Sequence, residues 1–293
     1  MRRPLALLLV TLLAVLAAGC GGSSNKSSAG GTTTTASCAK ADLNLVNAGM
    51  LTIGTDNPAY PPWYGGTPKS PWKVSDPYSG QGYESAVAYK VAAGLGFAKS
   101  EVKWVVAPFN TLFAPGAKKF DFDINQVSFK PVRAKAVDFS SSYYDVNQAL
   151  VVVKGTSIAK AGSIAALKPY KLGAQLGTTS YDYIVNNIKP SKKPAVFDTN
   201  DAAVQSLKNK QIDGLIVDYP TALYVTAVQV PNSTILGRFP SGGTQEHFGM
   251  VFSKGSSLVG CVNAVVSKLR ADGTLQRFQD TWIAKAGGAP VLK

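Results

Sequence analysis

Short apolar runs alternate with segments of helical periodicity from Leu43 onwards. In one helical segment, Val87, Val91 and Leu95 form an apolar stripe, and glycines mark its end. Strands that alternate with helices predict an α/β fold with mostly parallel sheets, and no internal repeat is visible. The predicted strands are 51–54, 102–106, 120–127, 149–153, 171–175 and 212–217, and the predicted helices are 84–95, 180–187, 200–208, 220–229 and 258–283, the last broken at 272–273.

The N-terminal segment has the pattern of an export signal. Residues 1–19 combine Arg2 and Arg3 with an apolar run that is too short for a membrane span, and small residues precede Cys20. This ending resembles a bacterial lipobox, although Ala17 stands where that motif prefers leucine. The resemblance implies cleavage before Cys20 and attachment of diacylglyceryl to its sulfur. A plain secretory signal with an incidental cysteine is the alternative.

The segment 20–37 begins with Cys20, and its residues 21–37 are almost all Gly, Ser and Thr. Such a composition cannot bury a core, so it predicts a flexible tether. A lipid anchor followed by a tether predicts a domain held at the extracytoplasmic face of the cell membrane, either periplasmic or at the cell surface. We expect it to be a monomer.

Composition and charge exclude several kinds of chemistry. One His and three Cys are too few for the usual metal clusters, so we expect no metal site and no cofactor, and histidine-based catalysis is disfavoured. The formal net charge is +13, but the basic residues are scattered rather than gathered on one helix. The charge therefore indicates solubility and attraction to an anionic membrane or wall polymer rather than nucleic-acid binding.

Lipidation of Cys20 would leave Cys38 and Cys261 in an oxidising compartment. An even remainder predicts one disulfide between them, which would tie the start of the folded domain to a helix near its end. Two separate buried thiols are the alternative.

Polar groups follow three predicted strands, where open α/β sheets bind ligands. Arg133, with Ser128 before it, offers a planar fork of donors that matches a carboxylate. Thr178 and Thr179 open a helix whose free N–H groups suit an anion. Asp218 ends an apolar strand, where an unpaired acid is costly. Together they predict a zwitterion site, with the α-carboxylate on Arg133 and Thr179 and the α-ammonium on Asp218.

Each of these signals also has a simpler explanation. Arg133 alone is more often a surface or salt-bridged residue, Asp218 alone is equally a helix N-cap before Pro220, and the two threonines alone are most often caps. Their joint occurrence at strand ends favours the ligand site.

The sequence blocks around these residues resemble a known family. The stretches LTIGTD, AKKFDFDINQVSFKPVRAKAVDFSSSYYDVNQAL, LGAQLGTTSYDYI, QIDGLIVDYPTAL, EHFGMVFSKGS and KLRADGTLQRFQDTW are similar, in order, to the extracellular solute-binding proteins of family 3, the amino-acid receptors of ABC importers. The resemblance covers roughly residues 43–282. With Cys38 and Cys261 included, the pattern most resembles lipoproteins of actinobacteria and related Gram-positive bacteria.

The resemblance implies a role for individual residues. Arg133 would clamp the α-carboxylate with Ser128 and Thr179, Asp218 would bind the α-amine, and Phe109 would stack on the ligand side chain. Gln126 would narrow the pocket, and Val132 and Lys130 depart from the family pattern beside it. The implied ligand-binding residues are Asp56, Tyr60, Trp63, Phe109, Gln126, Ser128, Arg133, Thr178, Thr179 and Asp218.

The identity of the ligand side chain stays open. Asp56 near Tyr60 and Phe109 favours a cationic ligand through an ion pair and cation–π contact, while a polar or amide amino acid is equally compatible. Trp72 and Tyr78, in the long segment 65–81, either roof the site or pack on the surface.

The implied architecture is a type II periplasmic-binding-protein fold, with two α/β lobes around a cleft and two crossover segments, near 145–150 and 239–247. Lobe 1 comprises 38–147 plus 246–293, and lobe 2 comprises 148–245. Closure on an amino acid would present the protein to an ABC permease.

Three other functions compete with this binding role. A cleft enzyme similar to cyclohexadienyl dehydratase would need an acid, for which Asp56 and Glu84 are the candidates, although Glu84 fits a structural role better and His247 fits a satisfied crossover residue. A ligand-sensing module of a receptor kinase and a structural or wall-binding lipoprotein are the others. We expect a binding protein and not an enzyme.

Overall fold

The structure is a computed structural model that describes residues 37–241, 244–283 and 288–293. The predicted signal peptide, the lipidation site at Cys20 and nearly all of the tether lie outside the described residues. The chain divides into a unit of residues 1–35 and a unit of residues 36–293, and the description below concerns the second. No helix within its described residues has both the length and the apolar character that a membrane crossing requires.

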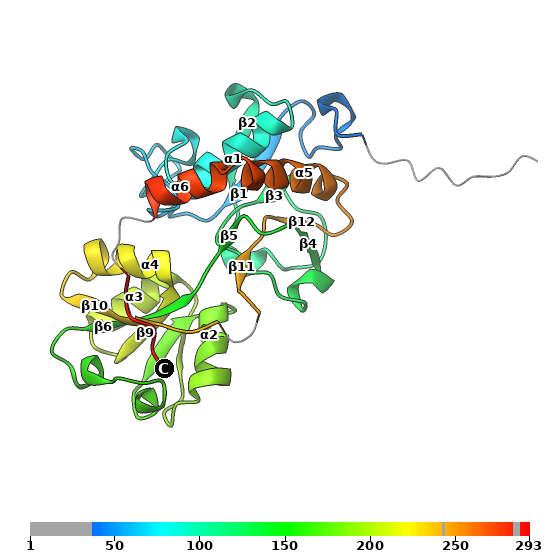
Figure 1. Cartoon of the computed structure of the whole chain (residues 1–293). Helices are drawn as coiled ribbons and strands as arrows, with labels where there is room; N and C mark the ends of the chain where they lie inside the picture. The colour runs from blue at the N-terminus through cyan, green and yellow to red at the C-terminus, as the bar shows by residue number, and fades with distance from the viewer. Residues whose placement is uncertain (1–36, 242–243, 284–287) are drawn as a thin grey trace, which may run out of the picture. The chain divides into compact units, whose positions relative to one another are not determined.

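The first lobe is built on a five-stranded sheet in the order β2-β1-β3-β12-β4. Helices α1 (Tyr83–Gly94), α5 (Leu258–Ala271) and α6 (Thr274–Trp282) pack against one another beside this sheet, as Figure 1 shows. The stripe predicted in α1 is buried as expected, with Val87 and Val91 fully inaccessible. The strands of this sheet are β1 (Leu51–Thr55), β2 (Val102–Val106), β3 (Phe122–Asp123), β4 (Val137–Phe139) and β12 (Val251–Ser253).

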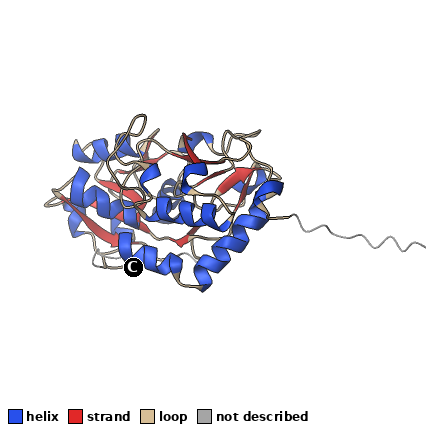
Figure 2. Ribbon diagram, turned by 90° about the horizontal axis from the view of Figure 1, so that it is seen from above, coloured by secondary structure: helices blue, strands red, loops and turns tan. Residues whose placement is uncertain are grey.

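The second lobe is built on another five-stranded sheet, in the order β10-β6-β9-β7-β8. Its helices are α2 (Thr179–Tyr183), α3 (Asn200–Lys208) and α4 (Tyr219–Tyr224), and both α2 and α4 continue as π-helical turns. Helices lie around the strands of both sheets in the view of Figure 2. The strands are β6 (Gln148–Val153), β7 (Leu172–Gln175), β8 (Ala195–Phe197), β9 (Gly214–Asp218) and β10 (Ser233–Arg238).

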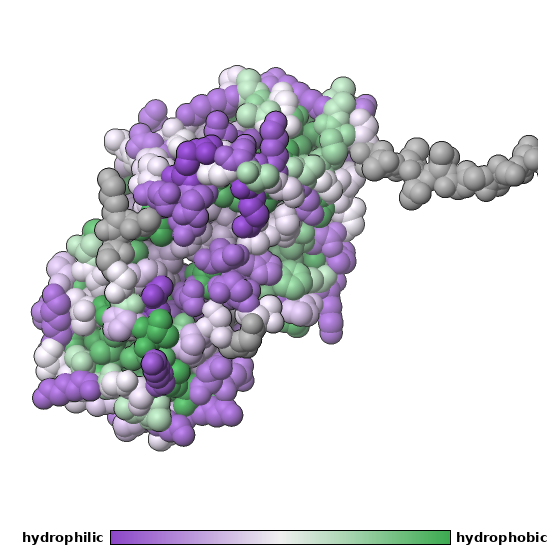
Figure 3. Space-filling model, in the orientation of Figure 1, coloured by the Kyte–Doolittle hydropathy of each residue, from purple (hydrophilic) through white to green (hydrophobic). Residues whose placement is uncertain are grey.

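Two chain segments connect the lobes. The short strands β5 (Tyr144–Asp145) and β11 (His247–Phe248) pair antiparallel, and the chain enters the second lobe after β5 and returns before β11. The predicted crossings near 145–150 and 239–247 lie at these two places. Figure 3 shows hydrophilic side chains over both lobes on the face in view.

Three details of the prediction are wrong. The sheets are mixed rather than mostly parallel, because β12, β6 and β10 pair antiparallel with their neighbours. The strand predicted over 120–127 is only Phe122–Asp123, since the backbone turns away and reaches a left-handed conformation at Gln126, where φ is 49°. Residues 288–293 do not join the first lobe: Val291 bridges to Arg238 of β10, and Leu292 packs into the second lobe's core.

The predicted disulfide is present. Cys38 and Cys261 are bonded, with their Cα atoms 5.5 Å apart, so the start of the described chain is fixed to α5. The alternative of two separate thiols is thereby excluded.

Candidate functional site

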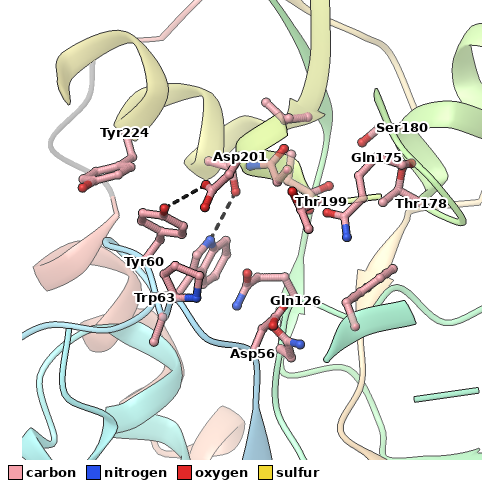
Figure 4. Close-up of a pocket in the computed structure, with 18 of the residues that line it drawn as sticks. Asp56, Tyr60, Trp63, Gln126, Gln175, Thr178, Ser180, Thr199, Asp201 and Tyr224 are labelled. Carbon is pink, nitrogen blue, oxygen red and sulfur yellow. Dashed lines mark hydrogen bonds between the residues drawn. The ribbon is translucent and has the colours of Figure 1, made fainter. Parts of the chain in front are cut away.

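A cavity of about 170 Å³ lies between the two lobes. It is smaller than the sites of drug-sized ligands, which span about 300–1,000 Å³, so it suits a small molecule. The ends of β1, β7 and β9 and the starts of α2 and α3 contribute to its wall, and Figure 4 shows side chains converging on it from both lobes. All ten residues predicted from the sequence line this one cavity.

Arg133 occupies one end of the cavity and is 6% exposed. Its guanidinium donates hydrogen bonds to the carbonyl oxygen of Ser128 at 2.6 Å and, across the cleft, to that of Gly177 at 2.7 Å. It also lies over the ring of Phe113, with 4.4 Å to the centroid. Burial lowers the pKa of Arg133 to about 10, so the group stays charged at neutral pH.

No carboxylate of the described residues forms an ion pair with Arg133. Arginine has five N–H donors, and two are used in the bonds to Ser128 and Gly177. The buried cation therefore keeps donors for an anion.

Asp218, at the end of β9, lies on the second-lobe side of the cavity. It stands at the N-cap position of α4 but makes no capping hydrogen bond, so the simpler explanation as a helix cap is wrong. Instead, Gln148 Nε2 donates to Asp218 Oδ1 at 2.6 Å. Burial, together with the negative charge of Glu246, raises the pKa of Asp218 well above its usual value.

A network of polar side chains connects Asp218 with the first lobe. Gln148 also donates to Glu246 Oε2 at 3.1 Å and accepts a hydrogen bond from Ser180 at 2.6 Å. The hydroxyl of Ser128 donates to Glu246 Oε1 at 2.5 Å. These contacts fix the positions of the groups that face the cavity.

The two predicted threonines have different roles. The hydroxyl of Thr178 accepts a hydrogen bond from the backbone N–H of Tyr181 and donates to the carbonyl of Gln175, so it caps α2. The hydroxyl of Thr179 lies 3.4 Å from that of Ser128 on the other lobe. Thr179 therefore faces the same space as Ser128.

Another part of the cavity lining is aromatic and acidic. The hydroxyl of Tyr60 donates to Asp201 of α3 at 2.8 Å, across the cleft, and its ring lies 5.6 Å from that of Tyr224. Figure 4 shows Tyr60, Asp201 and Tyr224 together, while Asp56 is drawn beside Gln126. Burial raises the pKa of Asp56, and the negative charge of Asp201 raises it further.

Trp63 is 2% exposed and packs edge-on against Tyr83, Tyr144 and Phe248. Its indole N–H reaches Thr221 of the second lobe at 3.4 Å. It therefore forms a wall of the cavity and a contact between the lobes.

Glu84 lies behind the cavity and does not line it. It is fully buried, accepts the backbone N–H of Gln126 at 2.7 Å, and also binds the Gln126 amide and the Tyr143 hydroxyl. Burial raises the pKa of Glu84 to about 7. These contacts hold Gln126 in its left-handed conformation, which is the structural role expected from the sequence.

Three other residues considered from the sequence lie away from the cavity lining. Trp72 belongs to the first lobe's core, and Tyr78 hydrogen-bonds to the backbone of Trp104, so neither roofs the site. His247 stacks on Phe129 with 5.6 Å between ring centroids. Among the described residues, no group of three His, Cys, Asp or Glu side chains is placed to hold a metal ion.

Among the residues that sequence reasoning missed, Asp201 and Tyr224 line the cavity, and Gln148 and Glu246 hydrogen-bond to residues that line it. Gln148 and Glu246 flank the two crossovers, where a polar side chain reads as ordinary surface. Asp201 reads as an acid in the first turn of a helix, a favourable position against the helix dipole. The orientation of these four side chains toward the cleft depends on how the two lobes approach each other, which the sequence does not show.

Comparisons with known proteins identify the family to which this chain is similar. A sequence profile of the bacterial extracellular solute-binding proteins, family 3, matches residues 51–285. The L-cystine-binding protein TcyJ of Escherichia coli strain K12 is 29% identical over 263 residues, covering 86% of this chain and 90% of that protein. ABC transporter arginine-binding protein 1 of the same strain is 30% identical over 171 residues, covering 56% of this chain and 67% of that protein.

Solved structures of similar proteins share the fold. An ancestral arginine-binding protein bound to glutamine superposes with a TM-score of 0.66 at 29% identity, covering 81% of this chain and 99% of that one. An ancestral amino acid-binding protein, described as a precursor of cyclohexadienyl dehydratase, has a TM-score of 0.65 at 26% identity, covering 80% and 95%. These likenesses support the two-lobe type II fold predicted from the sequence.

Proposed function

We propose that this chain, which belongs to the bacterial extracellular solute-binding proteins of family 3, binds one amino acid between its lobes. It would then deliver the amino acid to an ABC permease. The relatives named above bind cystine, arginine and glutamine, which places amino acids first among the candidate ligands.

The observation that carries this proposal is the pair of unmatched charges in the cavity. Arg133 and Asp218 both line it, one from each lobe, and neither forms an ion pair with a described residue. A buried charge without a partner is costly, so the site is suited to a ligand that brings both an anion and a cation. The α-carboxylate would take the free donors of Arg133, and the α-ammonium would meet Asp218.

Closure of the lobes follows from the placement of Arg133 and Asp218 on different lobes. A ligand held by Arg133 alone satisfies one of its charged ends, while the second end is satisfied when Asp218 approaches from the other lobe. Closing also removes water, which strengthens both ion pairs. A permease would then distinguish the closed form from the open one.

The proposed lobes, within the described residues, are 38–147 with 246–283, and 148–241 with 244–245 and 288–293. Upstream of them, we propose that residues 1–19 are a signal peptide and that Cys20 carries the lipid which holds the chain at the extracytoplasmic face of the membrane. Replacing Cys20 with Ser should abolish incorporation of a labelled fatty acid and release the protein from the membrane fraction. Retention of the label in the variant would contradict the anchor.

A cleft enzyme is the second candidate, favoured by the likeness to the precursor of cyclohexadienyl dehydratase. Of the two acids that the sequence suggests for such chemistry, Glu84 accepts three hydrogen bonds behind Gln126 and does not line the cavity, whereas Asp56 does. We propose binding rather than catalysis. Turnover of prephenate by the purified protein would contradict this.

The experiment for the binding role is a thermal-shift screen of the purified protein against the twenty standard amino acids and cystine. A ligand that binds only the folded state stabilises it by mass action, by about 2.7 kcal/mol at one hundred times its dissociation constant. We expect at least one amino acid to raise the melting temperature in a dose-dependent way. No shift with any of them would contradict the proposal.

A further inference from the structure

We propose that the site selects an amino acid with a cationic side chain, and that Asp201 of the second lobe determines this specificity together with Asp56 of the first. This inference rests on the proposed function and names the ligand class of the same cavity. Asp201 is the residue that sequence reasoning did not find, and it acts from the lobe opposite to Asp56.

The balance of charges in the cavity is the first argument. Four charged side chains line it, of which three are acids (Asp56, Asp201 and Asp218) and one is a base (Arg133). None of the four forms an ion pair with a described residue. A zwitterion matches Arg133 and Asp218 and leaves two carboxylates without a counter-charge, so a further positive charge on the ligand completes the balance.

The position of the two remaining acids is the second argument. Both line the cavity together with Tyr60, whose hydroxyl donates a hydrogen bond to Asp201 Oδ1. Asp201 Oδ2 accepts no hydrogen bond from the described residues. A guanidinium or ammonium group between Asp56 and Asp201 would therefore be held from both lobes, which couples recognition of the side chain to closure.

The aromatic surroundings are the third argument. The rings of Tyr60 and Tyr224 are 5.6 Å apart at an angle of 45°, and Trp63 lines the same end of the cavity. Aromatic faces attract cations, most strongly where water is excluded. The methylene stem of a long side chain would pack on the same rings, which a short polar side chain cannot do.

The first turn of a helix is also a favourable place for an acid, and this alone would explain an aspartate at position 201. That explanation does not account for the direction of its side chain, which turns across the cleft to the hydroxyl of Tyr60 (Figure 4). Neutral ligands fit less well, because the NH2 group of an amide side chain can donate to the two carboxylates but brings no positive charge to balance them. Cystine would bring a second carboxylate along with its second ammonium, and Arg133 is the one base among the described lining residues, so that carboxylate would lack a counter-charge.

The test compares arginine with citrulline, which has nearly the same shape but a neutral side-chain end, by calorimetric titration of the purified protein. We expect arginine to bind at least one hundred times more tightly than citrulline. Asp201→Asn should reduce the ratio of the two affinities tenfold or more, and combining it with Asp56→Asn should remove most of the remaining preference.

Asp198→Asn is the matched control, because Asp198 is an exposed acid three residues before Asp201 and lies outside the cavity lining. This control should keep the ratio of the unmodified protein. A protein that binds citrulline, glutamine or cystine as tightly as arginine would overturn this inference and leave the binding role standing. An unchanged ratio in Asp201→Asn would overturn it as well. By contrast, a failure of the unmodified protein to bind any amino acid would overturn the proposed function.

Discussion

Arg133 and Asp218 are the two residues on which amino-acid binding depends most. Each is placed by hydrogen bonds to neutral groups, Arg133 by the carbonyls of Ser128 and Gly177 and Asp218 by the amide of Gln148. Neutral partners orient a charge without cancelling it, so each charge stays available to a ligand.

The first prediction concerns Arg133. Arg133→Ala should cost about 2–5 kcal/mol of binding free energy, because the ligand carboxylate would be buried without a partner. Arg133→Lys should recover part of this loss, since it keeps the charge but not the planar fork. Calorimetry with the best amino acid from the thermal-shift screen measures both. Wild-type affinity in the alanine variant would contradict the assignment.

The second prediction is a pH dependence of ligand binding. Burial and Glu246 raise the pKa of Asp218 in the unliganded protein, while Arg133 opposes the rise. Pairing with an ammonium requires the ionised carboxylate, so affinity should fall as pH falls through this raised pKa, by up to about tenfold per pH unit for one proton. Titrations in buffers of different ionisation enthalpy should show proton release on binding. Proton uptake would contradict the prediction.

The third prediction concerns the stability of the unliganded fold. The pKa of Glu84 is raised from 4.5 to about 7, so the folded state holds a proton that the unfolded state has lost in this interval. Stability should therefore decline as pH rises between about 4.5 and 7. Glu84→Gln should make that slope shallower in urea denaturation, because one of the acids with a raised pKa no longer titrates. A slope as steep as in the unmodified protein would contradict the assignment.

At the scale of elements, strand ends and helix starts position the site. The sequence predicts an element correctly where local apolar periodicity determines it. This holds for β1, β6, β9, α1 and α3. Strands β4, β8, β10 and β12 were not found, because they are short or carry mixed burial and are fixed by their partners in the sheet. The same reason hid Gln148 and Glu246, whose roles depend on contacts between distant segments.

The fourth prediction concerns a contact between elements of different lobes. Lys130, beside the Arg133 turn, forms an ion pair with Asp182 of α2. The two side chains are 26% and 40% exposed, so the pair should contribute less than about 1 kcal/mol to closure. Lys130→Met should weaken ligand affinity less than about fivefold at low salt, and the difference should vanish near 1 M salt. A larger effect that resists salt would contradict this.

At the scale of the whole described unit, the disulfide ties residues 223 positions apart. The fifth prediction is that the double variant Cys38→Ser and Cys261→Ser loses about 3–5 kcal/mol of unfolding free energy, chiefly because its unfolded chain is less restricted. Urea denaturation of the oxidised protein and the variant measures this. A difference below about 1 kcal/mol would contradict the prediction.

Several contacts cross the cleft without any ligand. Besides the bond between Tyr60 and Asp201, the Asn110 amide donates to the carbonyl of Asp198 at 2.8 Å. The conformation described is therefore a closed one, held by polar contacts across the cleft. An equilibrium between open and closed forms, shifted by ligand, follows from this arrangement.

The most direct test of the central claim is a crystal structure with the amino acid that gives the largest thermal shift. We predict the α-carboxylate within hydrogen-bonding distance of the Arg133 guanidinium and the α-ammonium against Asp218, with the lobes closed around both. A ligand bound outside this cavity, or one whose charged ends touch neither side chain, would contradict the account.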